Sequence, residues 1–479
     1  MALAWLGIDL GTQGVRALLV TAGGTVAGSG SAPLLRDLRE GKRHEQDPEE
    51  WWEAVRTACR AALRGTGATV AGLAVCGTSG TVLLTGPGGR PTTPALMYDD
   101  GRAGAEAAAL RAAGLAVQDS WALPKAHWLT ARHGPGRLCH QPDLINARLT
   151  GHPVPADSSH ALKTAYDVGR GRWPGSAGLP EGTLPDVVRP GTLLGEVCPA
   201  AADATGIPAG TPVVAGMTDG CAAQIAAGAL GEGAWNSVLG TTLVLKGAAA
   251  EPVRDPAGVV YNHRAPDGTW LPGGASSVGA GALAARFPGA DAAALDAAAA
   301  AFEPSGAIAY PLVSPGERFP FHAPRATALL LGDPVSDADH WAALLQGVAF
   351  TERLCLDYLH HLGAPFEGPL ALTGGAARSA YWNRLRADVL GRPVRVPGRT
   401  EPALGMAVLA RHGTGAAPTL AAAARAMTSP GTTVDPRPAR TARFAEPYAR
   451  LVDALESRGW LPAPVAAHAR DRLRGDGTD

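Results

Sequence analysis

The 479-residue sequence has few of the features that mark specialised classes of protein. Its six cysteines form no C-x-x-C pair, which argues against a metal cluster or disulfide framework and predicts reduced thiols in a cytoplasmic protein. The 13 histidines show no H-x-x-x-H spacing, so no transition-metal site is predicted. A formal net charge of -1 gives no electrostatic case for binding nucleic acid or an anionic membrane. No apolar run reaches ~18 residues, and the N-terminus has no basic region typical of a signal peptide, so neither a membrane span nor secretion is expected.

Two common nucleotide-binding motifs are also missing. The chain has no G-K-[ST] ending of a Walker A loop, and no strand followed by G-x-G-x-x-G and a helix. It is nevertheless too long for a single hydrophobic core, so two domains are expected. The boundary is predicted near Glu232, which divides the chain into residues 1–232 and 233–479.

A glycine-bracketed turn lies close to the N-terminus. Two apolar segments between Leu6 and Val20 are joined by Gly11-Thr12-Gln13-Gly14, which predicts a β-hairpin. Glycine lets the backbone approach an anion, and Asp9 at the strand end could hold a hydrated Mg²⁺ that bridges to phosphate. An ordinary hairpin at a sheet edge explains the same residues equally well.

Two further glycine-rich turns follow in the second half. Gly240-Thr241-Thr242 turns a hairpin expected over residues 234–246, and Gly374-Gly375-Ala376 joins a strand at 369–373 to a helix. A turn that opens a helix suits a nucleotide at the helix N-terminus. Any one of the three turns fits ordinary loop chemistry, whereas together they favour a site for nucleotide phosphates.

Asp219 is the candidate catalytic residue. It follows a short apolar strand at 213–216 and precedes an Ala-rich helix. One interpretation is a helix N-cap, for which Asp is common. The other is a general base for phosphoryl transfer to a hydroxyl, and a helix N-terminus would favour the ionised carboxylate that this role needs.

In order along the chain, the motifs GIDLGT, EQDPEEWW, VVAGMTDG, VLGTT, LTGGAARSAYWNRLRADVLGRPV and EPALGMAVLA resemble those of FGGY carbohydrate kinases. The resemblance implies an α/β fold of two actin-like (ribonuclease H-like) domains with a central cleft, as in the actin/hexokinase/Hsp70 superfamily. It also implies ATP and Mg²⁺ as cofactors. It assigns Asp219 as catalytic base, Asp9 to water-bridged Mg²⁺ and the sugar, Gly240 to Thr242 to phosphate, and Gly374 to Ser379 to adenosine. The resemblance also suggests a homodimer as the oligomeric state to test.

The loop Gly77-Thr78-Ser79-Gly80-Thr81 indicates which sugar is the expected substrate. Typical bacterial xylulokinases carry G-Q-M-H-G here, and this chain is similar instead to D-ribulose kinases of cyanobacteria and plastids, through GTSGTVLL, SHALKTAYD and YPLVSPGERFP. That similarity implies that Ser79 faces the ketose, although a turn serine bonded to its own backbone is the alternative. The predicted reaction converts D-ribulose to D-ribulose 5-phosphate. D-xylulose kinase and a sugar- or nucleotide-binding regulator with weak ATPase activity are the alternatives.

Several other positions bear on binding or on structure. Gln13 stands where the family often has Ser or Thr, and Ala376 stands where it often has Gly, which could loosen nucleotide binding. Lys125 is interpreted as a solvated lysine at a helix start, and Trp382 as a core residue. The Asp99, Asp100 and Arg102 segment is either a cleft loop or a surface salt bridge. The charged, glycine-containing tail after Pro464 favours disorder.

Overall fold

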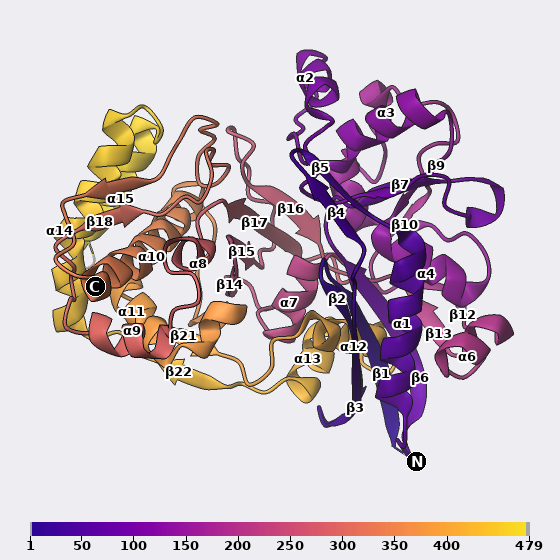
Figure 1. Ribbon diagram of the computed structural model, residues 1–479. Coiled ribbons are helices and arrows are strands. Elements are labelled where there is room, and N and C mark those ends of the chain that lie inside the picture. The colour runs from indigo at the N-terminus through magenta and orange to yellow at the C-terminus, as the bar shows by residue number, and fades with distance from the viewer. Residues whose placement is uncertain (1, 476–479) are drawn as a thin grey trace. The chain divides into compact units, whose positions relative to one another are not determined.

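The computed structural model describes residues 2–475, which fold into two compact α/β units (Figure 1). The first unit contains the chain up to Gly228 and two later segments, His263–Thr269 and Glu401–Ser429. The second unit comprises Ala229–Asn262, Trp270–Thr400 and the chain from Pro430 onward. None of the helices within residues 2–475 combines the length and apolar character that a bilayer span requires.

The first unit is built on a six-stranded sheet. Its strands, in spatial order, are β12 (Leu193–Glu196), β13 (Pro212–Val214), β6 (Thr69–Gly77), β1 (Leu3–Leu10), β2 (Gly14–Thr21) and β3 (Val26–Pro33). Strands β1, β6 and β13 are parallel, whereas β2, β3 and β12 pair with their neighbours in antiparallel fashion. The carboxyl ends of β1, β6 and β13 therefore meet at one edge of the sheet, which is where ligands bind in open α/β sheets.

The alternation of side chains along β1 explains how helices cover both faces of this sheet. Leu6, Ile8 and Leu10 join the core that includes Trp51 of α1 (Pro48–Leu63). Gly7 faces the other way, where an added Cβ would lie 1.7 Å from a backbone carbonyl of α12 (Pro402–Gly413). Only glycine permits that approach, because any side chain would push α12 off the sheet.

The first unit also holds a five-stranded sheet and several short elements. The second sheet contains β4 (Asp37–Glu40), β5 (Arg43–Gln46), β8 (Ala95–Leu96), β7 (Val82–Thr85) and β9 (Arg137–His140). The other elements are α2 (Gly104–Ala112), α3 (Ala122–His133), α4 (Gln141–Thr150), β10 (Ala156–Asp157), α5 (Ser158–Ala161), β11 (Val187–Val188), α6 (Pro199–Thr205), α7 (Asp219–Ala226) and α13 (Leu420–Met427).

The second unit repeats the plan of the first. Its sheet has the order β16 (Tyr261–Arg264), β17 (Trp270–Ser276), β15 (Leu243–Gly247), β14 (Trp235–Leu239), β20 (Leu370–Thr373), β21 (Val394–Val396) and β22 (Thr432–Val434). An antiparallel hairpin, β14–β15, again lies beside parallel strands, β20 and β21. The remaining elements are α8 (Gly281–Arg286), α9 (Ala292–Ala299), β18 (Ile308–Tyr310), β19 (Leu329–Leu331), α10 (Asp337–His361), α11 (Ala380–Leu390), α14 (Pro438–Ser457) and α15 (Ala463–Gly475).

The structure differs from two expectations about the second half. The division into residues 1–232 and 233–479 omits the return of α12 and α13 to the first unit, where they lie beside the indigo strands in Figure 1. The close packing of α12 against α7 requires glycine at position 405, since a Cβ there would lie 2.0 Å from the carbonyl oxygen of Ala222. The tail after Pro464 is helical through Gly475, because Val465, Ala466 and Ala469 form a buried stripe. The last four residues, 476–479, lie outside the described part.

Candidate active site

Two aspartates stand together at the carboxyl edge of the first sheet. Asp9 is near the end of β1, is 5% exposed, and lies within electrostatic range of Asp219, the first residue of α7. Burial and the negative charge of Asp219 raise the pKa of Asp9 to about 7, against the opposing charge of Arg16. Two adjacent carboxylates provide the hard oxygen ligands and negative charge that suit Mg²⁺. Residues 2–475 contain no group of three or more His, Cys, Asp or Glu side chains that could hold a metal ion directly.

Asp219 is placed by the start of α7. Thr218 occupies the N-cap position and makes no side-chain capping bond, so Asp219 is the first helical residue and not the cap. Its Oδ1 accepts a hydrogen bond from the Gly220 N–H at 2.7 Å. The Thr218 N–H donates to Ser159 Oγ at 3.0 Å, and Ser159 in turn bonds to the buried Asp157. The chain Asp157–Ser159–Thr218 thus holds the candidate base in position.

Ser159 was overlooked in the sequence as a positioning residue. Its segment, SHALKTAYD, was singled out only as a marker of a subgroup. The signal that could have found it is the Asp-Ser-Ser-His pattern at 157–160, in which Asp157 caps a one-turn helix. The partner of Ser159 is 59 residues away, however, so the role itself requires the folded chain.

The turn between β1 and β2 places the predicted phosphate-binding residues beside Asp9. Gly11 N–H donates to the Gly14 carbonyl at 3.0 Å, which closes the turn. Gln46 donates from Nε2 to the Thr12 carbonyl at 2.8 Å and braces it from the neighbouring sheet. Gln13 is exposed, so its amide is free to face solvent or ligand.

The loop after β6 leaves one hydroxyl without a partner. Thr78 and Thr81 share a 2.6 Å hydrogen bond, and Thr78 also donates to Gln141. Ser79 Oγ is shielded from solvent and has no hydrogen-bond partner among the described residues. An unsatisfied buried hydroxyl costs about 1–3 kcal/mol, which a ligand hydroxyl would offset. The alternative of a turn serine bonded to its own backbone does not match this geometry.

Two lysines hold the backbone of the same loop. Lys163 Nζ donates to the Ser79 carbonyl at 3.1 Å, and Lys125 Nζ donates to the carbonyls of Gly80 and Met97 at 3.0 and 2.6 Å. Lys125 is fully buried, so its interpretation as a solvated lysine was wrong. Burial, assisted by the charge of Lys163, lowers the pKa of Lys125 to about 7. Its place within the apolar stretch Ala122–Leu129 was the available signal.

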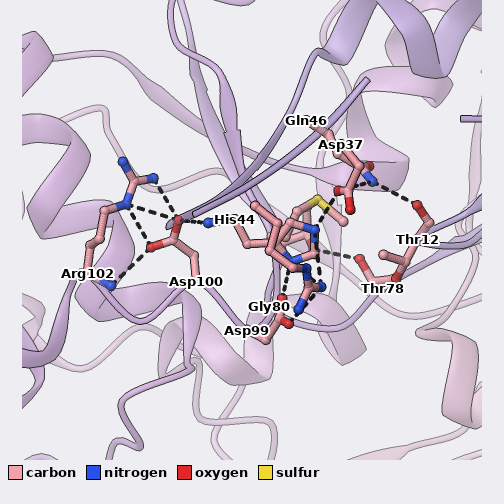
Figure 2. Close-up of polar contacts among 12 residues, drawn as sticks. Thr12, Asp37, His44, Gln46, Thr78, Gly80, Asp99, Asp100 and Arg102 are labelled. Atoms are coloured by element: carbon pink, nitrogen blue, oxygen red, sulfur yellow. Dashed lines mark hydrogen bonds and ion pairs between the residues drawn. The ribbon is translucent and has the colours of Figure 1, made fainter. Parts of the chain in front are cut away.

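The segment from Asp99 to Arg102 forms part of a polar network around the buried residues His44 and Asp100 (Figure 2). Asp100 is fully buried and accepts from the His44 N–H at 2.9 Å and from Arg102 Nη2 at 2.7 Å. Burial alone would raise the pKa of Asp100, but the bonds from Arg102 and His44 outweigh it and lower that pKa. The His44 ring bonds to both Asp99 and Asp37. The Asp100 carboxylate is buried and the Arg102 side chain is only 20% exposed, so their ion pair is not a surface salt bridge.

The second unit brings its two glycine turns side by side. Because β14 and β20 are parallel neighbours, the residues after Leu239 and Thr373 emerge at the same sheet edge. Gly374 has φ +85°, and an added Cβ would lie 2.5 Å from the Leu239 carbonyl. Gly240 N–H donates to the Thr242 carbonyl, and Thr241 accepts through its carbonyl from Gly281 N–H. Apart from the adjacent residues of the chain, no heavy atom of residues 2–475 would lie within 4 Å of a Cβ on Gly240 or Gly375, so both turns are open.

Several side chains of the segment predicted to bind adenosine make contacts within the protein. Ser379 caps α11 by accepting from the Trp382 N–H at 3.0 Å and donates to Asp296 at 2.6 Å. Ala376 is buried within a short 3₁₀ turn. Trp382 is 3% exposed and donates to the Leu345 carbonyl, in keeping with the prediction that it is a core residue.

Comparison with known proteins identifies the family. Residues 4–226 match the model of the N-terminal domain of the FGGY family of carbohydrate kinases, and residues 235–414 match that of the C-terminal domain. The chain belongs to this family. It is accordingly a carbohydrate kinase, an enzyme that transfers a phosphoryl group from ATP to a sugar, and its two α/β units are the actin-like domains of that family.

Several of the similar proteins are named as xylulose kinases. The chain is 30% identical to a xylulose kinase of Streptomyces rubiginosus over 442 residues, covering 85% of this chain and 87% of the relative. It is 28% identical to a xylulose kinase of Escherichia coli (strain K12), covering 85% and 89%. A crystal structure of a xyloylose kinase from Brucella ovis is 27% identical, with a TM-score of 0.86 over 95% of this chain and 99% of that one.

Proposed function

We propose that this FGGY kinase phosphorylates the terminal hydroxyl (O5) of a ketopentose, with D-ribulose as the first substrate and D-xylulose as the second. The observation that carries the proposal is the pairing of Asp219 with the buried Asp9 at the edge of the first sheet. The names of the similar xylulose kinases support the pentulose class and favour D-xylulose as the alternative.

Asp219 is proposed to accept the proton of the sugar hydroxyl as that oxygen attacks the γ-phosphate and ADP leaves. A carboxylate positioned in this way typically contributes ~10²–10⁴-fold to the rate. Asp9 would hold Mg²⁺ through water and contact the sugar. The ion would neutralise charge on the transferred phosphoryl group.

The other predicted residues are proposed to bind the substrates. Gly11, Thr12 and Gln13 would present backbone groups to phosphate in the first unit. In the second unit the corresponding roles fall to Gly240, Thr241, Thr242, Gly374, Gly375 and Ala376. The hydroxyl of Ser379 already has two partners, so its proposed contribution to adenosine binding is to hold the turn through its cap.

Selective phosphorylation of D-ribulose is the expected result of an assay with Mg-ATP and a panel of ketoses and polyols. The assay would couple ADP release to detection of the sugar phosphate by mass spectrometry, with a control that lacks sugar. A dominant D-xylulose signal would establish the alternative substrate. ADP release without any sugar phosphate would overturn the kinase assignment for these sugars and favour a regulator with weak ATPase activity.

Ser79→Ala is expected to raise KM for the ketose with little change in KM for ATP. Ser79 Oγ is the hydroxyl of this loop that has no hydrogen-bond partner in the protein. The substitution therefore removes a hydrogen bond to the ligand and no hydrogen bond within the protein. A lost neutral hydrogen bond of about 0.5–1.5 kcal/mol corresponds to roughly a 2- to 12-fold rise in KM. Ser31→Ala, at an exposed serine of β3, is the matched control. An unchanged ketose KM in Ser79→Ala would return Ser79 to the role of a turn residue.

A further inference from the structure

A cavity outside the proposed sugar and nucleotide sites is lined by several arginines. It has a volume of about 310 Å³ and is lined by parts of the first unit only, namely the segment 166–171, the strand β11, and Arg264 and Ala265 of the segment His263–Thr269. Its charged lining consists of Arg170, Arg189 and Arg264, and it includes no carboxylate. Net positive charge concentrated in a concave surface attracts anions and strengthens their binding.

The three guanidinium groups differ in their protein partners. Arg170 pairs with Asp167 at 3.3 Å, and that carboxylate lines a neighbouring cavity instead. Arg264 donates from Nε to the Gly268 carbonyl at 3.2 Å. Arg189 makes no side-chain hydrogen bond or ion pair among residues 2–475. At least one full positive charge in the lining therefore lacks a protein counter-charge.

Neutral donors complete the lining. Ser158 and Tyr166, which both carry hydroxyl groups, line the cavity. Burial and the neighbouring Asp167 raise the pKa of Tyr166, so its phenol stays protonated and can donate. Tyr166 is itself fixed by an edge-on contact with Trp173, with ring centroids 4.9 Å apart.

We propose that this cavity binds a small phosphate-bearing anion, such as a phosphorylated sugar. A phosphate monoester carries nearly two negative charges near neutral pH and three acceptor oxygens, which match several guanidinium forks better than a single carboxylate does. The volume lies at the lower end of the ~300–1,000 Å³ typical of ligand pockets, which favours a compact ligand over a nucleotide. The proposal does not depend on which sugar the kinase phosphorylates.

The test is calorimetric titration of the full-length protein with inorganic phosphate and, separately, with a pentulose 5-phosphate. Saturating Mg-ADP keeps the nucleotide site occupied. Arg189→Gln is expected to weaken binding ~10- to 100-fold, as the loss of a charge-assisted hydrogen bond of about 1.5–3 kcal/mol implies. Arg90→Gln, at an exposed arginine of the same unit outside this cavity, removes the same charge and is expected to have no effect.

The two titrants distinguish the source of the ligand. Tighter binding of the pentulose phosphate would assign the cavity to a phosphorylated metabolite, and equal binding would assign it to free phosphate. Failure of wild type to bind either titrant, or affinities that Arg189→Gln leaves unchanged, would overturn the proposal, because binding insensitive to Arg189 belongs to another site. Arg264→Gln provides a second variant from a different segment and is expected to weaken binding in the same direction.

Discussion

Asp219→Asn is expected to lower the rate of sugar phosphorylation by ~10²–10⁴-fold, the contribution of a positioned general base. The amide has the same shape as the carboxylate, and its oxygen can still accept from the Gly220 N–H, but it cannot take up the proton of the attacking hydroxyl. Nucleotide affinity should change little, because Asp219 is not among the residues proposed to bind ATP. The measurements are kcat from the coupled ADP assay and ATP affinity by calorimetry.

A matched control separates the loss of the base from the loss of one negative charge. Asp203→Asn changes an exposed aspartate of the same unit, at the end of α6, and should keep full activity. Comparable loss of ATP affinity and kcat in Asp219→Asn would indicate a damaged fold. Turnover close to that of wild type would show that Asp219 is not the base.

Asp9→Asn is expected to stabilise the ligand-free protein at pH 8 relative to wild type. In the folded state the pKa of Asp9 is raised from its usual value of 3.8 to about 7, chiefly by burial and then by the charge of Asp219. A raised carboxyl pKa favours the protonated folded state, so the resulting stability is present below pH ~4 and is lost as the pH rises through about 7. A difference of about three pKa units corresponds to roughly 4 kcal/mol as an upper bound.

Urea unfolding of wild type and Asp9→Asn at pH 5 and pH 8 measures this effect. The difference in free energy of unfolding between the two proteins reports on Asp9 and its coupling to Asp219, since groups that do not interact with Asp9, such as Lys125, contribute equally to both. Mg²⁺ should recover part of the wild-type stability at pH 8 and have less effect on Asp9→Asn, because the variant lacks the carboxylate that is proposed to hold the ion. Parallel pH profiles for the two proteins would contradict the pairing of Asp9 with Asp219.

Much of the local structure could be predicted because its causes lie close together in the chain. Asp47 followed by Pro48 and two glutamates predicts a helix start, and the Asp47 side chain does accept from the Glu49 N–H. The turns at 11–14 and 240–242 were predicted from glycines between apolar segments, and both join antiparallel strands. The placement of Asp9 near a strand end and of Asp219 at a helix start was also predicted, from the apolar segments that precede them.

What could not be predicted depends on residues brought together from far apart. The partners of Lys125, the carbonyls of Gly80 and Met97, come from other segments, 45 and 28 residues away. His44 and Asp100 are 56 residues apart in sequence, so no local pattern shows that they share a network. The helical tail was missed for a different reason, since its composition suggested disorder while its buried stripe of Val465, Ala466 and Ala469 required a helix.

The sequence by itself determined the family, the α/β class and the identity of the candidate catalytic residues, because motifs and hydrophobic periodicity are properties of neighbouring residues. Only the tertiary structure decided that Ser79 has an unpartnered hydroxyl and that Lys125 is buried. Only in the folded chain do Arg170, Arg189 and Arg264 line one cavity, and only there does α12 pack with the first unit. Burial, the absence of a hydrogen-bond partner and the local excess of one charge are set by what packs around a residue, and that packing exists only once distant segments have come together.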